Sequence, residues 1–301
     1  MYSRIFCAVV IFKKKLNVEN FLNGEVHYFY PYLNNVKKLL LTIFSFVVSV
    51  VLSAHEFWLQ PDKFIYKRGE EINIRFNVGE NFEGENWSGD TSKIQSLNFY
   101  YSDVKDDLTA AMGVEKGDSI QFSLVDEGTA MVTFNSKNSY IELDSAKFNA
   151  YLLEDGLKDA IKYRKENKET GSAGHEYYQR SVKTIIQVGA VYDSTFKQKT
   201  DLPLDVIPQT NPYSIKNKKE MTVKVFFQQA PLKNALIKIW HHKKNETIKE
   251  EYTTNRDGEV SFDIETNGKW MVSCVKMIHL KDNPEAEWQS YWGSCTWGYS
   301  K

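Results

Sequence analysis

The residues best placed to do chemistry are His55 and Glu56, because the sequence before them is typical of a secretory signal. Two lysines at 37–38 precede an apolar run, Leu39–Leu52, and the small residue Ala54 ends the segment. A run of 14 residues is too short to cross a membrane as a helix, so it indicates a signal peptide. Cleavage after Ala54 would make His55 the first residue, whose amine and ring Nδ1 can chelate one metal ion together. Cleavage one residue earlier would also leave a chelating terminus.

Further metal ligands are sought among the other histidines and Glu56. An amine, an imidazole and one or two more nitrogens in a plane suit Ni(II) or Cu(II), whereas Zn(II) favours a tetrahedral set. His175 follows a polar Gly-Ser-Ala-Gly loop and is the first candidate partner, the alternative being an exposed histidine without a role. His279 is expected near a strand end, as a ligand or in a local hydrogen bond, and Glu56 as an oxygen ligand, a hydrogen-bond acceptor or a solvated charge. His241 and His242 would point to opposite faces of a strand and are interpreted as a surface pair. The predicted metal ligands are therefore His55, His175, His279 and Glu56.

Charge excludes some classes of partner. The chain that begins at His55 has 247 residues, of which 32 are basic and 37 acidic, so its net charge is about −5. It has no basic stripe, which makes nucleic acid and anionic membrane surfaces poor candidates. No second apolar run of spanning length follows, and residue 55 is not a lipid-accepting cysteine. We therefore expect a soluble protein after cleavage, located in the periplasm or secreted.

Two cysteines, Cys274 and Cys295, remain after cleavage, in a compartment that permits disulfides. We expect residues 270–279 and 288–298 to form a hairpin that turns around Asn283–Glu285. In that hairpin, two residues lie opposite each other when their residue numbers add up to 569, and those of Cys274 and Cys295 do. This register favours a cross-strand disulfide over a thiolate pair that binds a metal.

Alternation of apolar and polar residues predicts a β-rich first domain. Residues 72–78 alternate with the period of two that marks a half-buried strand. Similar runs recur at 94–101, 119–125, 129–134 and 138–143, between turn residues typical of a β-sandwich. At 145–168 the spacing becomes helical, Asp144 or Ser145 can cap the start, and Gly156 interrupts it. We expect a small helical insertion there.

A proline-rich stretch at 201–213 disfavours helix and central strand, and we place the domain boundary there. Further strands are expected at 221–227, 235–241, 246–253 and 259–264, and Asp257-Gly258 predicts a hairpin turn between the last two. The predicted fold is mainly β, with two antiparallel β-sandwich domains. They are an N-terminal domain at 55–208 with a helical insertion at about 145–168, and an immunoglobulin-like or transthyretin-like domain at 213–301.

The first 36 residues do not resemble a normal signal start. We expect translation to begin near Val36 and interpret residues 1–36 as an extension of the gene model. A long leader with an uncleaved anchor is the alternative. On the first interpretation, residues 37–54 are the signal peptide.

Several blocks of the chain, in order, resemble a bacterial periplasmic family. They are His55–Pro61, Val78–Phe82, Tyr151–Leu157, Tyr178–Lys183, Leu204–Tyr213, Asp257-Gly258 and Gly268–Trp270. The family is catalogued as a domain of unknown function and is described as associated with nickel or cobalt uptake, with members encoded near transition-metal transporters. The resemblance runs from His55 to Trp297 and implies that the mature N-terminal histidine contacts the metal and that the tail is an immunoglobulin-like or carboxypeptidase-regulatory-like module. This chain departs from the family at Lys276, where many members have histidine; here His279 follows three residues later.

The sequence shows no nucleophile elbow, phosphate-binding glycine loop, dinucleotide fingerprint or zinc-protease helix motif. We therefore expect no enzyme. The leading hypothesis is a periplasmic protein that captures Ni(II) or Co(II), with Cu(II) or Zn(II) as alternative ions, and presents it to a metal transporter or an outer-membrane receptor. Two hypotheses stay open beside it: a copper enzyme with a histidine brace, and a scaffolding or adhesion sandwich of the cell envelope that binds no metal.

Overall fold

The computed structural model describes residues 56–87, 91–112, 119–216 and 219–300. The predicted signal peptide at 37–54 and the extension at 1–36 lie outside these residues. The fold is mainly β, as the sequence predicts, and contains two α-helices among the described residues. No helix in this part of the chain has the length and apolar character that a membrane span requires.

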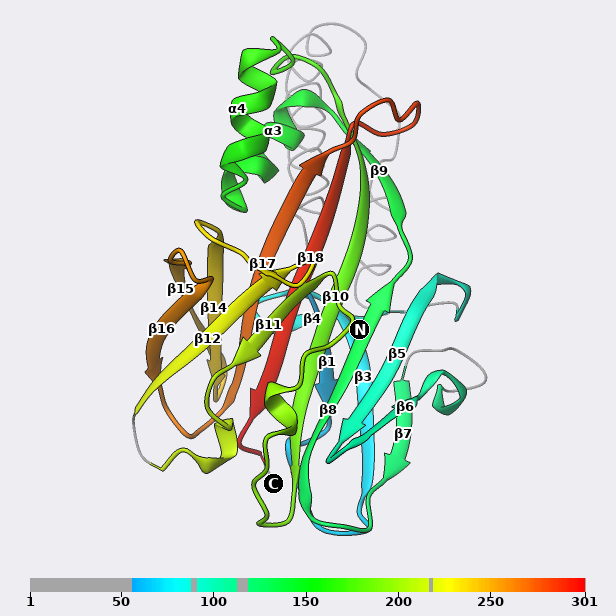
Figure 1. Ribbon diagram of the computed structural model, residues 1–301, viewed down its shortest axis with the longest axis vertical. Helices are drawn as coiled ribbons and strands as arrows, with labels where there is room; N and C mark the ends of the chain where they lie inside the picture. The colour runs from blue at the N-terminus through cyan, green and yellow to red at the C-terminus, as the bar shows by residue number, and fades with distance from the viewer. Residues whose placement is uncertain (1–55, 88–90, 113–118, 217–218, 301) are drawn as a thin grey trace, which may run out of the picture. The chain divides into compact units, whose positions relative to one another are not determined.

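The described strands form three sheets (Figure 1). The first contains β1 (Glu56–Pro61), β3 (Glu71–Glu80), β4 (Glu83–Asn86) and β7 (Ser119–Ser123). The second has ten strands, which are β2 (Ile65–Tyr66), β5 (Ile94–Tyr101), β6 (Val104–Asp107), β8 (Gly128–Ser136), β9 (Ser139–Leu143), β10 (Gly174–Val188), β14 (Leu236–Lys243), β15 (Glu246–Thr253), β17 (Lys269–His279) and β18 (Trp288–Gly298). The third contains β11 (Leu204–Pro208), β12 (Lys219–Phe227), β13 (Ala230–Pro231) and β16 (Glu259–Ile264).

Strand β10 is the centre of the ten-stranded sheet. It pairs with β8 and β9 in antiparallel register, and with β2 and β18 in parallel register. The parallel pairs differ from the purely antiparallel sheets expected from the sequence. Strands from both sides of the predicted boundary at 208–213 share this sheet, and residues 54–301 form one compact unit. The division into two domains stays a prediction.

Two helices occupy the predicted insertion, α3 (Ser145–Glu154) and α4 (Lys158–Glu166). The Asp144 carboxylate accepts a hydrogen bond from the Lys147 N–H, which caps α3 as predicted. Gly156 joins the helices with a φ of 62°, and a Cβ there would lie 2.7 Å from the Leu236 Cβ. Both the backbone angle and the close approach to β14 therefore require glycine at this turn.

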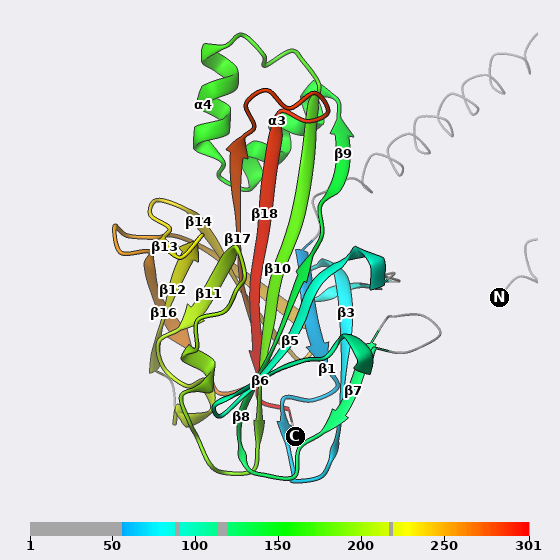
Figure 2. The ribbon, with the colours of Figure 1, turned by 45° about the vertical axis from the view of Figure 1, so that its right-hand side comes forward.

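One face of the ten-stranded sheet is covered by β1 and by the two helices (Figure 2). The Ser294 hydroxyl of β18 donates a hydrogen bond to the Phe57 carbonyl at 2.7 Å. Trp288 of the same strand packs in a cluster with Phe148 and Leu152 of α3. Because side chains alternate between the faces of a strand, Ser294 and Trp288 point to the same side. The start of β1 and the helical insertion therefore share this face.

The third sheet packs against the opposite face. Lys183 of β10 forms a buried ion pair with Asp205 of β11, with 2.5 Å between Nζ and Oδ1. Gly293 of β18 faces Leu204, whose Cγ would lie 2.8 Å from an added Cβ. Two sheets packed face to face around buried side chains form the β-sandwich that the sequence predicts.

The predicted hairpin turn at Asp257-Gly258 is a turn between sheets instead. Gly258 has a φ of 76°, and its N–H donates to the Asn255 carbonyl at 3.1 Å, so the tight turn itself is present. However, β15 pairs with β14, while β16 pairs with β12 of the third sheet. The chain therefore crosses between the layers of the sandwich at this point.

The structure does not form the predicted disulfide, and the final hairpin has a different register. Strands β17 and β18 do form a hairpin, but Cys274 lies opposite Gly293 and Cys295 lies opposite Val272. These pairs sum to 567, so the centre of the turn lies one residue earlier than predicted. Both cysteines are buried free thiols, and burial raises both thiol pKa values, Cys295 to about 12.

Candidate functional site

The structure does not bring together the three predicted metal ligands that it describes, Glu56, His175 and His279. His55 lies outside the described residues. Trp288 of β18 lies opposite Glu176 of β10 and opposite His279 of β17, so these three side chains point to one face of the sheet. His175 precedes Glu176 in β10 and therefore points to the other face. Throughout the described ranges, no group of three or more His, Cys, Asp or Glu side chains is arranged to hold a metal ion.

His175 and His279 each have local partners. His175 Nδ1 lies 2.9 Å from Glu287 Oε1, and its Nε2 lies 3.8 Å from Glu142 Oε1. The His279 ring stacks on Tyr163 of α4 at 4.1 Å between centroids and meets the edge of Trp288. His175 therefore forms ion pairs at the surface when protonated, and His279 attaches α4 to the sheet.

His241 and His242 point to opposite faces of β14, as predicted, but they are not a surface pair. The His241 ring is buried, stacks on Trp270 at 3.8 Å, and its Nε2 lies 3.1 Å from the Asn267 carbonyl. Burial lowers its pKa, so the neutral ring is favoured. His242 Nδ1 lies 2.8 Å from the Thr247 hydroxyl.

The polar feature that stands out is a buried charge cluster at the start of β1, made of Glu56, Asp155 and Lys238. Asp155 is the residue that ends α3, and Lys238 lies in β14. Lys238 Nζ donates to Asp155 Oδ1 at 2.6 Å and lies 3.9 Å from Glu56 Oε1. The three residues are 4–6% exposed, so water solvates none of these charges freely. We call this set the Glu56 cluster.

A third buried acid, Glu176, lies on the same face of the sheet. Glu176 of β10 accepts hydrogen bonds from the Tyr151 hydroxyl, at 3.2 Å, and from the Ser290 hydroxyl. The Trp292 indole N–H donates to Ser290 Oγ at 3.0 Å. Tyr151 and Asp155 belong to the last turn of α3 and its cap, so the same helix end contacts both Glu176 and Lys238.

Burial dominates the electrostatics of these acids. It raises the pKa of Glu56 to about 7 although Lys238 opposes the shift, and it raises the pKa of Glu176 to about 7. Burial raises the pKa of Asp155 as well. Although burial opposes it, the Asp155 and Glu56 carboxylates raise the pKa of Lys238, which keeps this lysine charged.

Acidic groups therefore outnumber basic groups in this region, and burial opposes their ionisation. Glu56 and Asp155 share Lys238, whereas Glu176 has only hydroxyl donors. Two buried carboxyl oxygens, Asp155 Oδ2 and Glu176 Oε2, have no hydrogen-bond partner among the described residues. Buried oxygens of this kind are costly unless a proton, a donor or a cation compensates them. The arrangement favours the approach of one more positive group.

Sequence reasoning found Glu56 and missed Asp155, Glu176 and Lys238. Lys238 carried a signal, since it is a charged residue between Ile237 and Ile239 in the first half of β14, where the other residues are apolar. A charge at such a position needs a buried partner. Nothing in the sequence spacing indicates that the partner is Asp155, which lies 83 residues away.

Comparisons with known proteins give a family and little else. A family model described as "Domain of unknown function (DUF4198)" matches residues 52–277. No curated protein matches the chain. Among solved structures, the D0-D1 domain of intimin shows 13% identity and a TM-score of 0.17 over 80% of this chain and 97% of that one.

Two further structures match at similar levels. Three N-terminal domains of the bacteriophage RB49 highly immunogenic outer capsid protein (Hoc) show 11% identity and a TM-score of 0.16, over 80% of this chain and 59% of that one. A DUF3823 family protein from Bacteroides uniformis shows 8% identity and a TM-score of 0.17, over 80% and 97%. At these scores the three structures carry no argument about this chain.

Proposed function

The chain belongs to the DUF4198 family, a domain of unknown function, and we propose that it is a periplasmic protein that binds nickel or cobalt at a terminus freed beside Glu56. The metal is cargo, which the protein presents to a metal transporter or an outer-membrane receptor. The periplasmic location and these partners rest on the predicted signal peptide and on the family resemblance described above.

The observation that carries the proposal is the excess of buried acidic groups over basic groups around Glu56. Glu56 and Asp155 share the single positive charge of Lys238, and buried oxygens of Asp155 and Glu176 have no partner among the described residues. A divalent cation bound at the chain terminus would favour the ionised forms of these carboxyl groups and compensate their charge. Burial would strengthen the attraction, because the effective dielectric constant is lower there than in water.

The ligands that cleavage would add are nitrogens. A chain that starts at residue 55 carries an α-amine and an imidazole one residue before Glu56, whose carboxylate is buried in the cluster. Amine, imidazole and carboxylate together form a mixed nitrogen and oxygen set, which Ni(II) and Co(II) accept. The described residues by themselves hold no such group of ligands, so the proposal depends on residue 55.

A copper histidine brace has less support than the mixed site. A brace needs a second histidine next to the terminus, and the described histidines are distant along their strands. His242 is four residues from Lys238 on β14, about 13 Å, and His279 is six residues from Ser273 on β17, about 20 Å. Carboxylates are the groups close to Glu56.

Calorimetric titration of protein processed to start at His55 tests the proposal. Ni(II), Co(II), Cu(II) and Zn(II) are compared, and saturable binding of Ni(II) or Co(II) is expected. His55→Ala and a Gly-Ser extension before His55 should both abolish the tight site, because each removes a chelating nitrogen or blocks it. His175→Ala and His279→Ala are the matched controls and should leave affinity unchanged. The proposal fails if the processed protein binds neither ion, or if His55→Ala binds as tightly.

The same titration has an expected pH dependence. The amine and the imidazole must lose protons to bind, and their reference pKa values are about 7.7–8.0 and about 6.5. Affinity should therefore fall steeply below about pH 6.5.

A further inference from the structure

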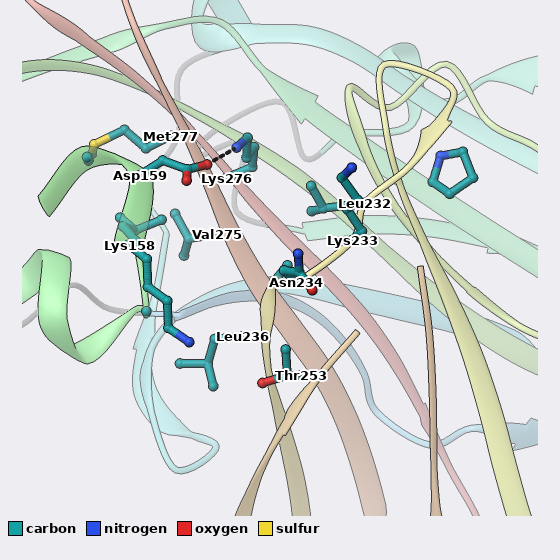
Figure 3. Close-up of a pocket in the computed structure, with 15 residues that line it drawn as sticks. Lys158, Asp159, Leu232, Lys233, Asn234, Leu236, Thr253, Val275, Lys276 and Met277 are labelled. Atoms are coloured by element: carbon teal, nitrogen blue, oxygen red, sulfur yellow. Dashed lines mark hydrogen bonds and ion pairs between the residues drawn. The ribbon is translucent and has the colours of Figure 1, made fainter. Parts of the chain in front are cut away.

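A cavity of about 650 Å³ lies between the start of α4, the loop that follows β13 and the middle of β17 (Figure 3). Strand β14 pairs with β17 as far as Lys238 and Ser273. Beyond them, Leu236 pairs with Thr253 and Val275 pairs with Trp292, and the two residues do not pair with each other. The two strands separate at this point, and the cavity occupies the space between them. Its volume falls within the range of about 300–1,000 Å³ that is usual for small-molecule sites.

The inner wall of the cavity is apolar. Leu157, Leu232, Val275 and Met277 line it and are each less than 9% exposed, and half-buried Leu236 adds a fifth aliphatic side chain. These residues come from four separate segments of the chain. These buried side chains can therefore contact an aliphatic or aromatic body.

The rim of the cavity is basic. Lys158, Lys233 and Lys276 line it, against a single acid, Asp159. Lys276 Nζ lies 3.4 Å from Asp159 Oδ2, the interaction drawn in Figure 3, so that pair is neutral together. Lys158 and Lys233 are exposed, and neither amine has an ion-pair partner among the residues that the structure describes. An apolar wall below two unpaired cations is complementary to an amphipathic anion.

We propose that this cavity binds a small carboxylate with an apolar tail, the tail against Val275, Leu232 and Met277 and the head group between Lys158 and Lys233. The site is distinct from the Glu56 cluster, although Gly156 of its wall follows Asp155 directly. It needs neither residue 55 nor a metal ion. Its test can therefore succeed or fail independently of the proposed metal binding.

Octanoate is the probe, titrated by calorimetry into the protein that starts at residue 55, with a chelator present to remove metal. Octylamine has the same tail and the opposite charge, and acetate has the same head group without the tail. We expect saturable binding of octanoate, no binding of octylamine, and affinity that rises by up to about fourfold for each methylene between acetate and octanoate. Amide chemical shifts should change at Gly156, Asn234 and Met277, which line the cavity.

Charge reversal locates the head group. Lys158→Glu with Lys233→Glu should weaken octanoate binding by about tenfold or more, because two attractions become repulsions. Lys162→Glu with Lys281→Glu is the matched control: both lysines lie outside the cavity lining, so octanoate affinity should stay the same. All four side chains lie at the surface, so each variant is expected to fold.

Three results would overturn the proposal. The first is the lack of saturable octanoate binding below about 10 mM. The second is binding of octylamine as tight as that of octanoate, which would show that the lysines select nothing. The third is an unchanged octanoate affinity in the variant that carries glutamate at both 158 and 233.

Discussion

Lys238 Nζ lies 2.6 Å from Asp155 Oδ1, and this contact joins the end of helix α3 to strand β14. Both side chains are buried, and Glu56 Oε1 lies 3.9 Å from the same amine. Lys238 therefore links three parts of the fold, which are the helical insertion, the ten-stranded sheet and strand β1. The stability of this junction and its affinity for a further positive charge depend on the same three side chains.

Removing the positive charge of Lys238 should destabilise the folded protein. Lys238→Met leaves Asp155 and Glu56 buried without a counter-charge, and we expect a loss of about 3–5 kcal/mol in the free energy of unfolding. Urea denaturation followed by tryptophan fluorescence measures it. Adding Asp155→Asn to Lys238→Met should restore a large part of the loss, since the uncompensated carboxylate is then removed.

An exposed ion pair provides the control. Lys162 and Glu166 of α4 lie 3.8 Å apart with side chains 75% and 64% exposed. Lys162→Met should change the free energy of unfolding by less than about 0.5 kcal/mol. If Lys238→Met lowers the free energy of unfolding by no more than Lys162→Met does, the charges of the Glu56 cluster do not stabilise the fold.

The second prediction concerns pH and Glu176. Burial raises its pKa from 4.5 to about 7, so between these values the folded protein binds more protons than the unfolded chain. Stability contributed by this group is therefore lost as pH rises from about 4.5 to about 7, by roughly 3 kcal/mol in total. Thermal unfolding of wild type and Glu176→Gln, compared from pH 4 to pH 8, measures the difference.

Glu176→Gln keeps a side chain of similar size and cannot ionise. The wild type should lose stability relative to this variant as pH rises, and the difference should level off above about pH 7.5. A constant difference across the whole range would mean that Glu176 titrates at its ordinary pKa and that its burial does not control its charge.

Local features of the fold could be read from the sequence. The alternation at 72–78 lies inside β3, and the helical spacing at 145–168 becomes α3 and α4 with the break at Gly156. Each of these depends on residues a few positions apart, where spacing and side-chain type decide the backbone conformation.

Long-range features could not be read in the same way. β10 was missed because its first half mixes polar and aromatic residues, while Val182–Val188 is buried on both faces and does not alternate. Its parallel pairing with β18 joins positions about 112 residues apart, which spacing does not encode. Lys238 and Asp155 are also far apart in the sequence, so their contact could not be predicted from spacing. The sequence therefore indicated Glu56 as a candidate ligand but not the charged residues around it.

The third prediction concerns the cysteines. Cys274 and Cys295 are buried free thiols, and burial raises their pKa values, so neither should react with a thiol reagent in the folded state. The protein that starts at residue 55 should show two reactive thiols in denaturant and none without it. Reducing agent should leave its melting temperature unchanged. A mass two units below that of the dithiol, measured without reductant, would show the disulfide after all.

The fourth prediction concerns Gly156, which sets the distance between the helical insertion and β14. Its φ of 62° disfavours any residue with a Cβ, and that Cβ would lie 2.7 Å from the Leu236 Cβ. Gly156→Ala should therefore cost about 2 kcal/mol in the free energy of unfolding, through strain and displaced packing. Gly171→Ala is the matched control, because an added Cβ there meets nothing within 4 Å, and it should change stability by less than about 0.5 kcal/mol. Equal effects of the two substitutions would mean that the turn between α3 and α4 does not press against β14 as described.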